Sequence, residues 1–145
     1  MPAAFTRHMY ETILVPMDGS DGSNRAAEHA LELADRFDST LHALFVVDTR
    51  RYGEPGLSST EIVVDELEDH GHALVDDFAS RADNIDVETE TRVCHGVPHD
   101  EIIEYATDVD ADVIVMGYQG HTHRQKIGSV VERVVRDGSR PVFTV

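Results

Sequence analysis

The 145-residue chain has the length of one ordinary domain, and with 41% apolar residues it has enough material for a buried core. No apolar run approaches the roughly 18 residues that span a bilayer, and the first ten residues lack the apolar segment of a secretion signal. A net charge of −16 disfavours binding to a nucleic-acid backbone, so we expect one cytoplasmic domain, residues 1–145, with neither a membrane nor a nucleic-acid partner.

The high net negative charge is compatible with a stable fold only under suitable solvent conditions. The chain has 28 acidic residues against 12 basic ones, and their mutual repulsion costs stability in dilute buffer. In molar salt the Debye length falls to about 3 Å and the repulsion is screened. We therefore expect a halophilic protein; the alternative that the composition leaves open is an ordinary acidic surface.

The first half of the chain alternates strand and helix patterns. Thr12–Pro16 (TILVP) has the length of a strand and ends in a turn at residues 17–20. A helix is predicted next, capped by Ser20 or Ser23. Residues 41–47 (LHALFVV) fit a strand that is buried on both faces. The helical pattern consists of Ala26, Ala30, Leu33, Ala34 and Phe37.

Residues 1–10 are predicted to be a flexible tail, and residues 48–59, with two glycines and a proline, an exposed loop. Residues 62–82 predict a long amphipathic helix. Residues 87–93 (VETETRV) alternate, which indicates an edge strand with one wet face. Pro98 suits the first turn of a further helix.

The last third contains a buried strand at residues 113–116 (VIVM), a valine-rich helix through residues 130–135 and a final strand at residues 142–145. The order β-α-β-α-β-α-β-α-β predicts an α/β fold, a single-domain five-stranded parallel sheet with helices on both faces. Ligands of such sheets bind at the carboxyl ends of the strands, where the strand order reverses. Asp18 and Gly117 meet there if the first and fourth strands are neighbours.

Residues 116–130 (MGYQGHTHRQKIGSV) are rich in glycine at that same edge. Gly117-x-x-Gly120 allows a ligand to approach the backbone, and Gly128-Ser129 opens a helix whose free N–H groups favour an anion. By spacing alone, the segment fits either a phosphate loop or an ordinary glycine-containing turn.

Five blocks of the chain, taken in order, resemble the universal stress protein family nearly from end to end. They are residues 13–20 (ILVPMDGS), 45–48 (FVVD), 96–102 (GVPHDEI), 128–134 (GSVVERV) and 141–145 (PVFTV). The resemblance implies a Rossmann-like fold of the adenine nucleotide alpha hydrolase type and a stress-response protein that binds ATP, with Mg²⁺ or Mn²⁺, as a regulator or sensor. The nucleotide contacts implied by position are Pro16, Asp18, Val46, Gly117, Gly120, Gly128, Ser129 and Val130. For Asp18, a turn or helix cap is the alternative.

The chain departs from the family between the second glycine and the Gly-Ser pair. Seven residues, HTHRQKI, stand where the family usually has nine, and His121-Thr122-His123 replaces a small or basic pair. Arg124 and Lys126 still supply positive charge. The shorter loop leaves a second hypothesis open, a dimeric interaction module of the same fold that binds AMP or no nucleotide.

Other chemistry has weaker support. No catalytic residue is expected, although slow ATP hydrolysis is compatible with the fold, and no metal site is expected because His121 and His123 lack a third ligand. Cys94, the only cysteine, fits a structural thiol better than a nucleophile. An adenylating enzyme would need a clustered Ser/Gly-rich loop directly after the first strand, a pattern that residues 16–23 (PMDGSDGS) lack. A flavin protein would need an aromatic sandwich, and none is visible in this chain, which has no tryptophan. The family resemblance further implies a homodimer through the C-terminal strand and an unknown protein partner.

Overall fold

The computed structural model describes residues 9–51, 58–119 and 127–145. Five strands form one sheet in the order β3-β2-β1-β4-β5, and every neighbouring pair is parallel. The predicted α/β class is confirmed. The strands are β1 (Thr12–Pro16), β2 (Thr40–Asp48), β3 (Thr89–Gly96), β4 (Val113–Met116) and β5 (Val142–Thr144).

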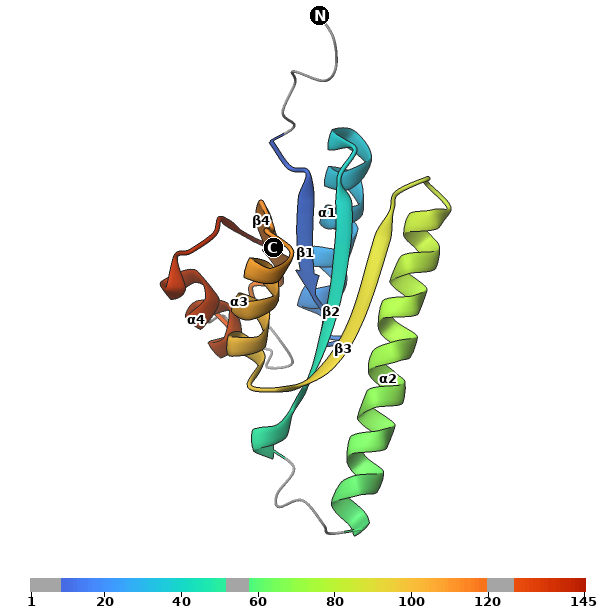
Figure 1. Ribbon diagram of the computed structural model, residues 1–145, viewed down its shortest axis with the longest axis vertical. Helices are drawn as coiled ribbons and strands as arrows, with labels where there is room; N and C mark the ends of the chain where they lie inside the picture. The colour runs from blue at the N-terminus through green and yellow to red at the C-terminus, as the bar shows by residue number, and fades with distance from the viewer. Residues whose placement is uncertain (1–8, 52–57, 120–126) are drawn as a thin grey trace, which may run out of the picture.

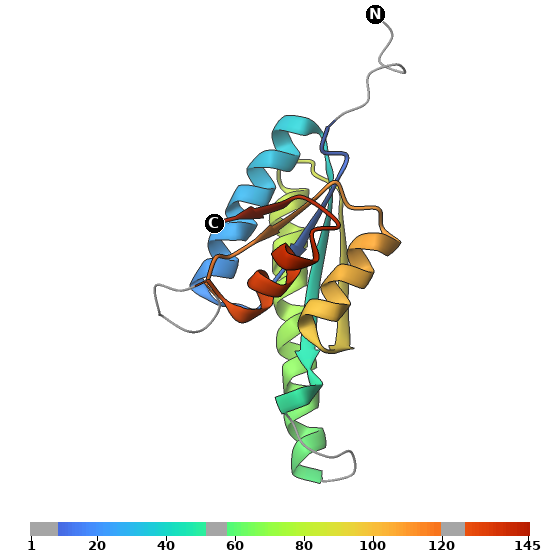
Figure 2. The same ribbon diagram turned by 90° about the vertical axis from the view of Figure 1, so that its left-hand side faces the viewer.

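Helices cover both faces of the sheet (Figure 1). One face carries α1 (Asp21–Phe37) and α2 (Ser58–Asp83), and the other carries α3 (Pro98–Asp108) and α4 (Ser129–Asp137). Figure 2 shows β5 at the edge opposite β3, with α4 in front of the sheet. A short 3₁₀ helix, η2 (Thr49–Arg51), follows β2.

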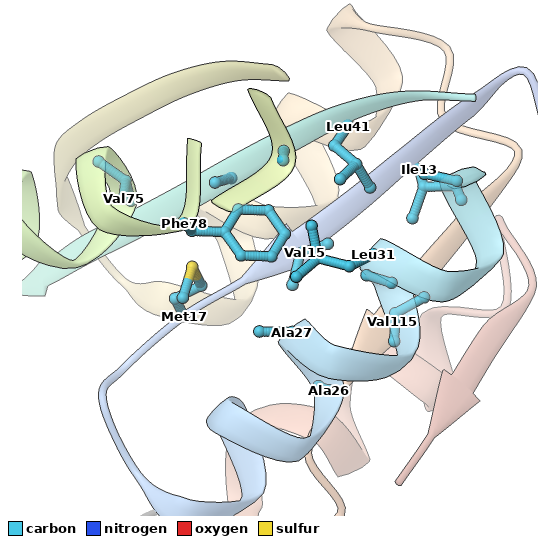
Figure 3. Close-up of a cluster of buried hydrophobic side chains, with 14 of the residues drawn as sticks. Ile13, Val15, Met17, Ala26, Ala27, Leu31, Leu41, Val75, Phe78 and Val115 are labelled. Carbon is cyan, nitrogen blue, oxygen red and sulfur yellow. The ribbon is translucent and has the colours of Figure 1, made fainter. Parts of the chain in front are cut away.

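Two apolar cores result, one for each face of the sheet. Along β1 and β2, odd-numbered side chains such as Val15 and Phe45 face α1 and α2, whereas Leu14 and Leu44 face α3 and α4. Figure 3 shows the first core, in which Phe78 of α2 lies over Met17, just past the end of β1. Burial on both faces explains why the inner strands are nearly continuous apolar runs.

Element boundaries differ from the predictions mostly around β2. β2 runs to Asp48, and α2 begins at Ser58, so much of the loop predicted over 48–59 is strand, η2 or helix. β3 is shifted from 87–93 to Thr89–Gly96 because it stays paired with β2 as far as Asp48. Tyr10, placed in the predicted tail, packs edge-on against Phe37 with 5.0 Å between ring centroids. Residues 1–8 lie outside the described part of the chain.

Candidate functional site

The site lies where the strand order reverses, between β1 and β4. Ile13 and Leu14 of β1 pair with Val113 and Ile114 of β4, which confirms that the two strands are neighbours. From β1 the chain continues into α1 on one face, and the chain leaving β4 reaches α4 on the other. The two connections therefore diverge at the carboxyl end of the sheet, the position at which doubly wound sheets bind ligands.

β2 extends beyond the end of β1 at this edge. The register ends at Pro16↔Leu44, and the Met17 N–H donates to the Leu44 carbonyl at 2.8 Å. Because backbone groups alternate between the two sides of a strand, the N–H and C=O of Val46 point to the same side as those of Leu44. β1 has no residue opposite Val46. A donor and an acceptor thus face the space beyond β1, as a planar base with a hydrogen-bonding edge would require.

Asp18 lies in the turn between β1 and α1. Its Oδ1 accepts from the Ser20 N–H at 2.9 Å, and its own N–H donates to Ser23 Oγ at 3.1 Å. Ser20 caps α1 by accepting from the Ser23 N–H at 3.1 Å. Asp18 therefore has the turn-forming role that the sequence offered as an alternative, while its side chain remains exposed at the edge of the sheet.

Two glycines bring the start of α1 against the chain leaving β4. A Cβ placed on Gly22 would lie 2.1 Å from the Gln119 carbonyl oxygen, and one on Gly117 would lie 2.4 Å from the Gly22 carbonyl carbon. Both distances are impossible for side-chain-bearing residues. Gly117 is therefore needed for close packing between two backbones, in addition to any role in admitting a ligand.

The start of α4 forms the other side of the site. Its N-cap is Gly128, and no side chain caps it, in contrast to Ser20 at α1. The Gly128 N–H donates to the Tyr118 carbonyl at 2.8 Å, which ties this helix to the end of β4. The N–H groups of the first turn, which helices leave without backbone partners, include those of Ser129 and Val130. They favour an anion together with the helix dipole.

Most of the residues predicted to bind nucleotide thus lie around one edge. Gly120 and the histidines at 121 and 123 lie outside the described residues. Val130 is partly buried against the core under α4, so its side chain has a packing role. The residues at this edge are Pro16, Asp18, Val46, Gly117, Gly128, Ser129 and Val130.

Gly22 is the site residue that sequence reasoning missed. The spacing of Gly22 after the first strand was available as a signal, but its partner Gln119 is 97 positions away. Only the folded chain brings them together.

The described residues offer few groups for acid–base or metal chemistry. Burial, with the Glu101 carboxylate adding to it, raises the pKa of the Cys94 thiol, so the unreactive protonated form prevails at neutral pH. Across residues 9–51, 58–119 and 127–145, no three His, Cys, Asp or Glu side chains are arranged to hold a metal ion. None of the described helices is long and apolar enough to cross a membrane.

The chain matches known proteins over almost its full length. Residues 9–145 match the model of the universal stress protein family. Universal stress protein MJ0531 of Methanocaldococcus jannaschii is 38% identical over 141 residues, covering 95% of this chain and 83% of that protein.

Solved structures agree with the sequence matches. The structure of hypothetical protein MJ0577, also from M. jannaschii, superposes with a TM-score of 0.87 at 25% identity, covering 94% of this chain and 96% of that one. A universal stress protein solved in complex with cAMP superposes with a TM-score of 0.73 at 26% identity, covering 94% and 97%.

Proposed function

Because this chain belongs to the universal stress protein family, we propose that it binds an adenine nucleotide, ATP with Mg²⁺ or Mn²⁺, and acts in the cytoplasm as a nucleotide-dependent regulator of the stress response. The base lies beyond the end of β1 against Val46, and the phosphates lie at the first turn of α4. Binding changes the surface around the site and thereby the affinity for a protein partner.

The uncapped start of α4 at the β1–β4 reversal is the observation that carries this proposal. In a chain with a net charge of −16, an anion site depends on local donors, and the backbone N–H groups of this turn supply them. A relative solved with cAMP supports a phosphate-bearing adenine ligand for the same fold.

Equilibrium binding of labelled ATP in molar KCl, with Mg²⁺ or Mn²⁺, tests the proposal. Ser129→Ala removes the hydroxyl at the start of α4 and is expected to weaken ATP binding about three- to tenfold, the loss of one hydrogen bond. Ser80→Ala, on an exposed position of α2, is the matched control and should leave binding unchanged. Wild-type protein that binds no ATP at millimolar ligand removes the ATP proposal.

The shortened segment between Gly120 and Gly128 favours one alternative, a dimeric interaction module that does not bind triphosphate. Two fewer residues leave less chain to wrap around three phosphates. A ligand series of adenosine, AMP and ATP distinguishes the two functions. Affinity that rises from AMP to ATP supports the ATP regulator, whereas a loss of affinity with each added phosphate supports the alternative.

We propose binding without rapid turnover. Asp18, the carboxylate nearest the end of β1 in the chain, already accepts a hydrogen bond within its own turn, which makes it a poor general base. Phosphate release far slower than about 1 s⁻¹ under saturating ATP is the expected result. Steady-state turnover at rates typical of enzymes, about 1 s⁻¹ or faster, would contradict it.

A homodimer through β5 completes the proposal. β5 is an edge strand, and Phe143 on it is 44% exposed. Exposed strand edges pair readily with a second strand, so two copies of β5 suit an antiparallel contact. Sedimentation at micromolar concentration in molar KCl should give a dimer, and Phe143→Asp a monomer. Ile62→Asp, a control at an exposed apolar position on α2, should remain dimeric.

A further inference from the structure

A histidine on α2 borders the site from the face opposite α4. The Nε2 of His70 lies 3.3 Å from the position that a Cβ on Gly19 would take. Gly19 follows Asp18 in the turn after β1 and has a φ of +81°, which keeps it in the left-handed region that glycine prefers. The imidazole edge therefore lies directly against the turn at the end of β1.

The position of His70 is set by close packing between α2 and β2. A Cβ on Gly71 would lie 2.4 Å from the Phe45 ring, so the absence of a side chain there lets the helix backbone rest on that ring. Phe45 contacts the His70 ring edge-on, with 6.0 Å between centroids. Phe45 immediately precedes Val46, whose backbone faces the space beyond β1. His70 is thus held beside the two strand ends that border this space.

His70 also has spare hydrogen-bonding capacity. The residue is exposed, and within the described part of the chain neither ring nitrogen makes a hydrogen bond or ion pair. His95, which packs on the same helix, is instead paired with Glu68. An imidazole fixed by ring packing, with a nitrogen available at the edge of a candidate site, is suited to contact a ligand.

We propose that His70 is a further nucleotide-binding residue, which contacts the ribose or base, and that it sets affinity at this end of the site. This inference rests on the proposed function. α2 covers β2 and β3, whereas α4, with the phosphate-binding turn, lies on the far face. The His70 ring therefore reaches the end of the ligand that carries no phosphate, and Nε2 hydrogen-bonds a ribose hydroxyl or a base nitrogen.

Binding of adenosine and of ATP to four proteins tests the assignment: wild type, His70→Ala, His70→Gln and His72→Ala. His70→Ala is expected to weaken both ligands by the same factor, about three- to tenfold, because the lost contact does not involve phosphate. His70→Gln places an amide near the position of Nε2 and should recover most of the affinity. His72→Ala is the matched control, since His72 is an exposed residue of the same helix two positions away.

Three results would overturn the inference while leaving the proposed function in place. Unchanged adenosine and ATP affinity in His70→Ala would exclude the contact, and weakening of ATP alone would assign His70 to the phosphates. Weakening that is accompanied by a lower melting temperature, with no shift of the wild-type His70 ring resonances on adding adenosine, would show a structural role. Wild-type protein that binds neither ligand would instead overturn the proposed function itself, and this inference with it.

Discussion

At the residue scale, the most informative polar group is His42, which is only 6% exposed in the middle of β2. Its Nδ1 lies 3.1 Å from the Tyr105 hydroxyl on α3 and 3.4 Å from the Glu90 carboxylate on β3. The Arg92 guanidinium lies over the Tyr105 ring, 5.2 Å from its centroid. These polar groups join the β2–β3 edge of the sheet to α3.

Stability should fall below neutral pH because of this histidine. Burial lowers the pKa of His42, against the opposing effects of Glu90 and Glu88. Below an unfolded-state pKa of about 6.5, the unfolded chain takes up a proton that the folded chain resists. The contribution of neutral His42 to the free energy of unfolding is therefore complete above this pH and is lost as pH falls through the lower folded pKa. Urea unfolding at pH 7.5 and 5.5 should show a larger loss for wild type than for His42→Gln. An equal loss in both proteins would contradict the assignment, and His72→Gln should behave like wild type.

The contact of Gly22 with Gln119 gives a second prediction at this scale. Gly22→Ala introduces a Cβ 2.1 Å from a backbone oxygen, so the backbone has to move. Such overpacking costs about 1–3 kcal/mol of unfolding free energy. Urea unfolding measures the cost, and Asn24→Ala, an exposed substitution in the same helix, is expected to cost nothing. A Gly22→Ala variant with the unfolding free energy of the wild type would show that the two backbones are farther apart.

At the element scale, the two helix starts beside the site differ in a way that matters for binding. Both helices have an acidic residue in the first turn, Asp21 in α1 and Glu132 in α4, but of the two only α1 has a side-chain cap, in which Ser20 accepts a hydrogen bond from the Ser23 N–H. α4 begins at Gly128 without a side-chain cap. The apolar residues Val131 and Val134 hold α4 on the sheet, so its start needs no cap to stay folded.

Gly128→Asp tests this difference. Gly128 has φ −64° and ψ 149°, which any residue adopts, and aspartate is a good N-cap, so unfolding free energy should stay the same or rise by a few tenths of a kcal/mol. The carboxylate would occupy the place of the nucleotide phosphates, and ATP affinity should fall at least about tenfold, a loss of about 1.4 kcal/mol. Asn84→Asp adds the same charge after α2, at the opposite end of the sheet, and should not change binding. Unaltered ATP affinity in Gly128→Asp would exclude this helix start from the site.

At the scale of the whole molecule, the most prominent property is the net negative charge. The ion pairs of the described residues are mostly exposed, such as Arg36–Glu32 and Arg136–Glu132, each within a single helix. Exposed ion pairs contribute little to the free energy of unfolding. Ion pairs do not change the net charge, so the full excess of −16 remains uncompensated. The net repulsion therefore acts on the fold as a whole and is sensitive to salt.

Raising KCl from about 0.15 M to about 1 M shortens the Debye length from about 8 Å to about 3 Å. The melting temperature should rise over this range, and NaCl should act in the same way, since both screen the same repulsion. A melting temperature that is flat or falls would refute the halophilic interpretation. It would favour the ordinary acidic surface.

Much of this protein follows from local patterns in the sequence. Apolar runs and helical spacing predicted the five strands and four α-helices of the described residues, though not the short η2, because periodicity depends only on which face of an element is buried. β1 at Thr12–Pro16 and β4 at Val113–Met116 were predicted without error in their bounds. The family resemblance added most of the residues at the β1–β4 edge, since it carries positions that no periodicity marks.

The tertiary structure decided what depends on register and on contacts between distant residues. β2 extends past β1 because the pairing ends at Pro16↔Leu44, a relation that no stretch of sequence contains by itself. Gly22 against Gln119, and Gly71 on the Phe45 ring, are backbone approaches that become necessary only when two elements meet. The sequence by itself determined the elements and the edge at which a ligand is expected. Three-dimensional packing alone decided that Val46 lies beyond the last residue that β1 pairs with β2, and that His70 lies beside this end of the strand.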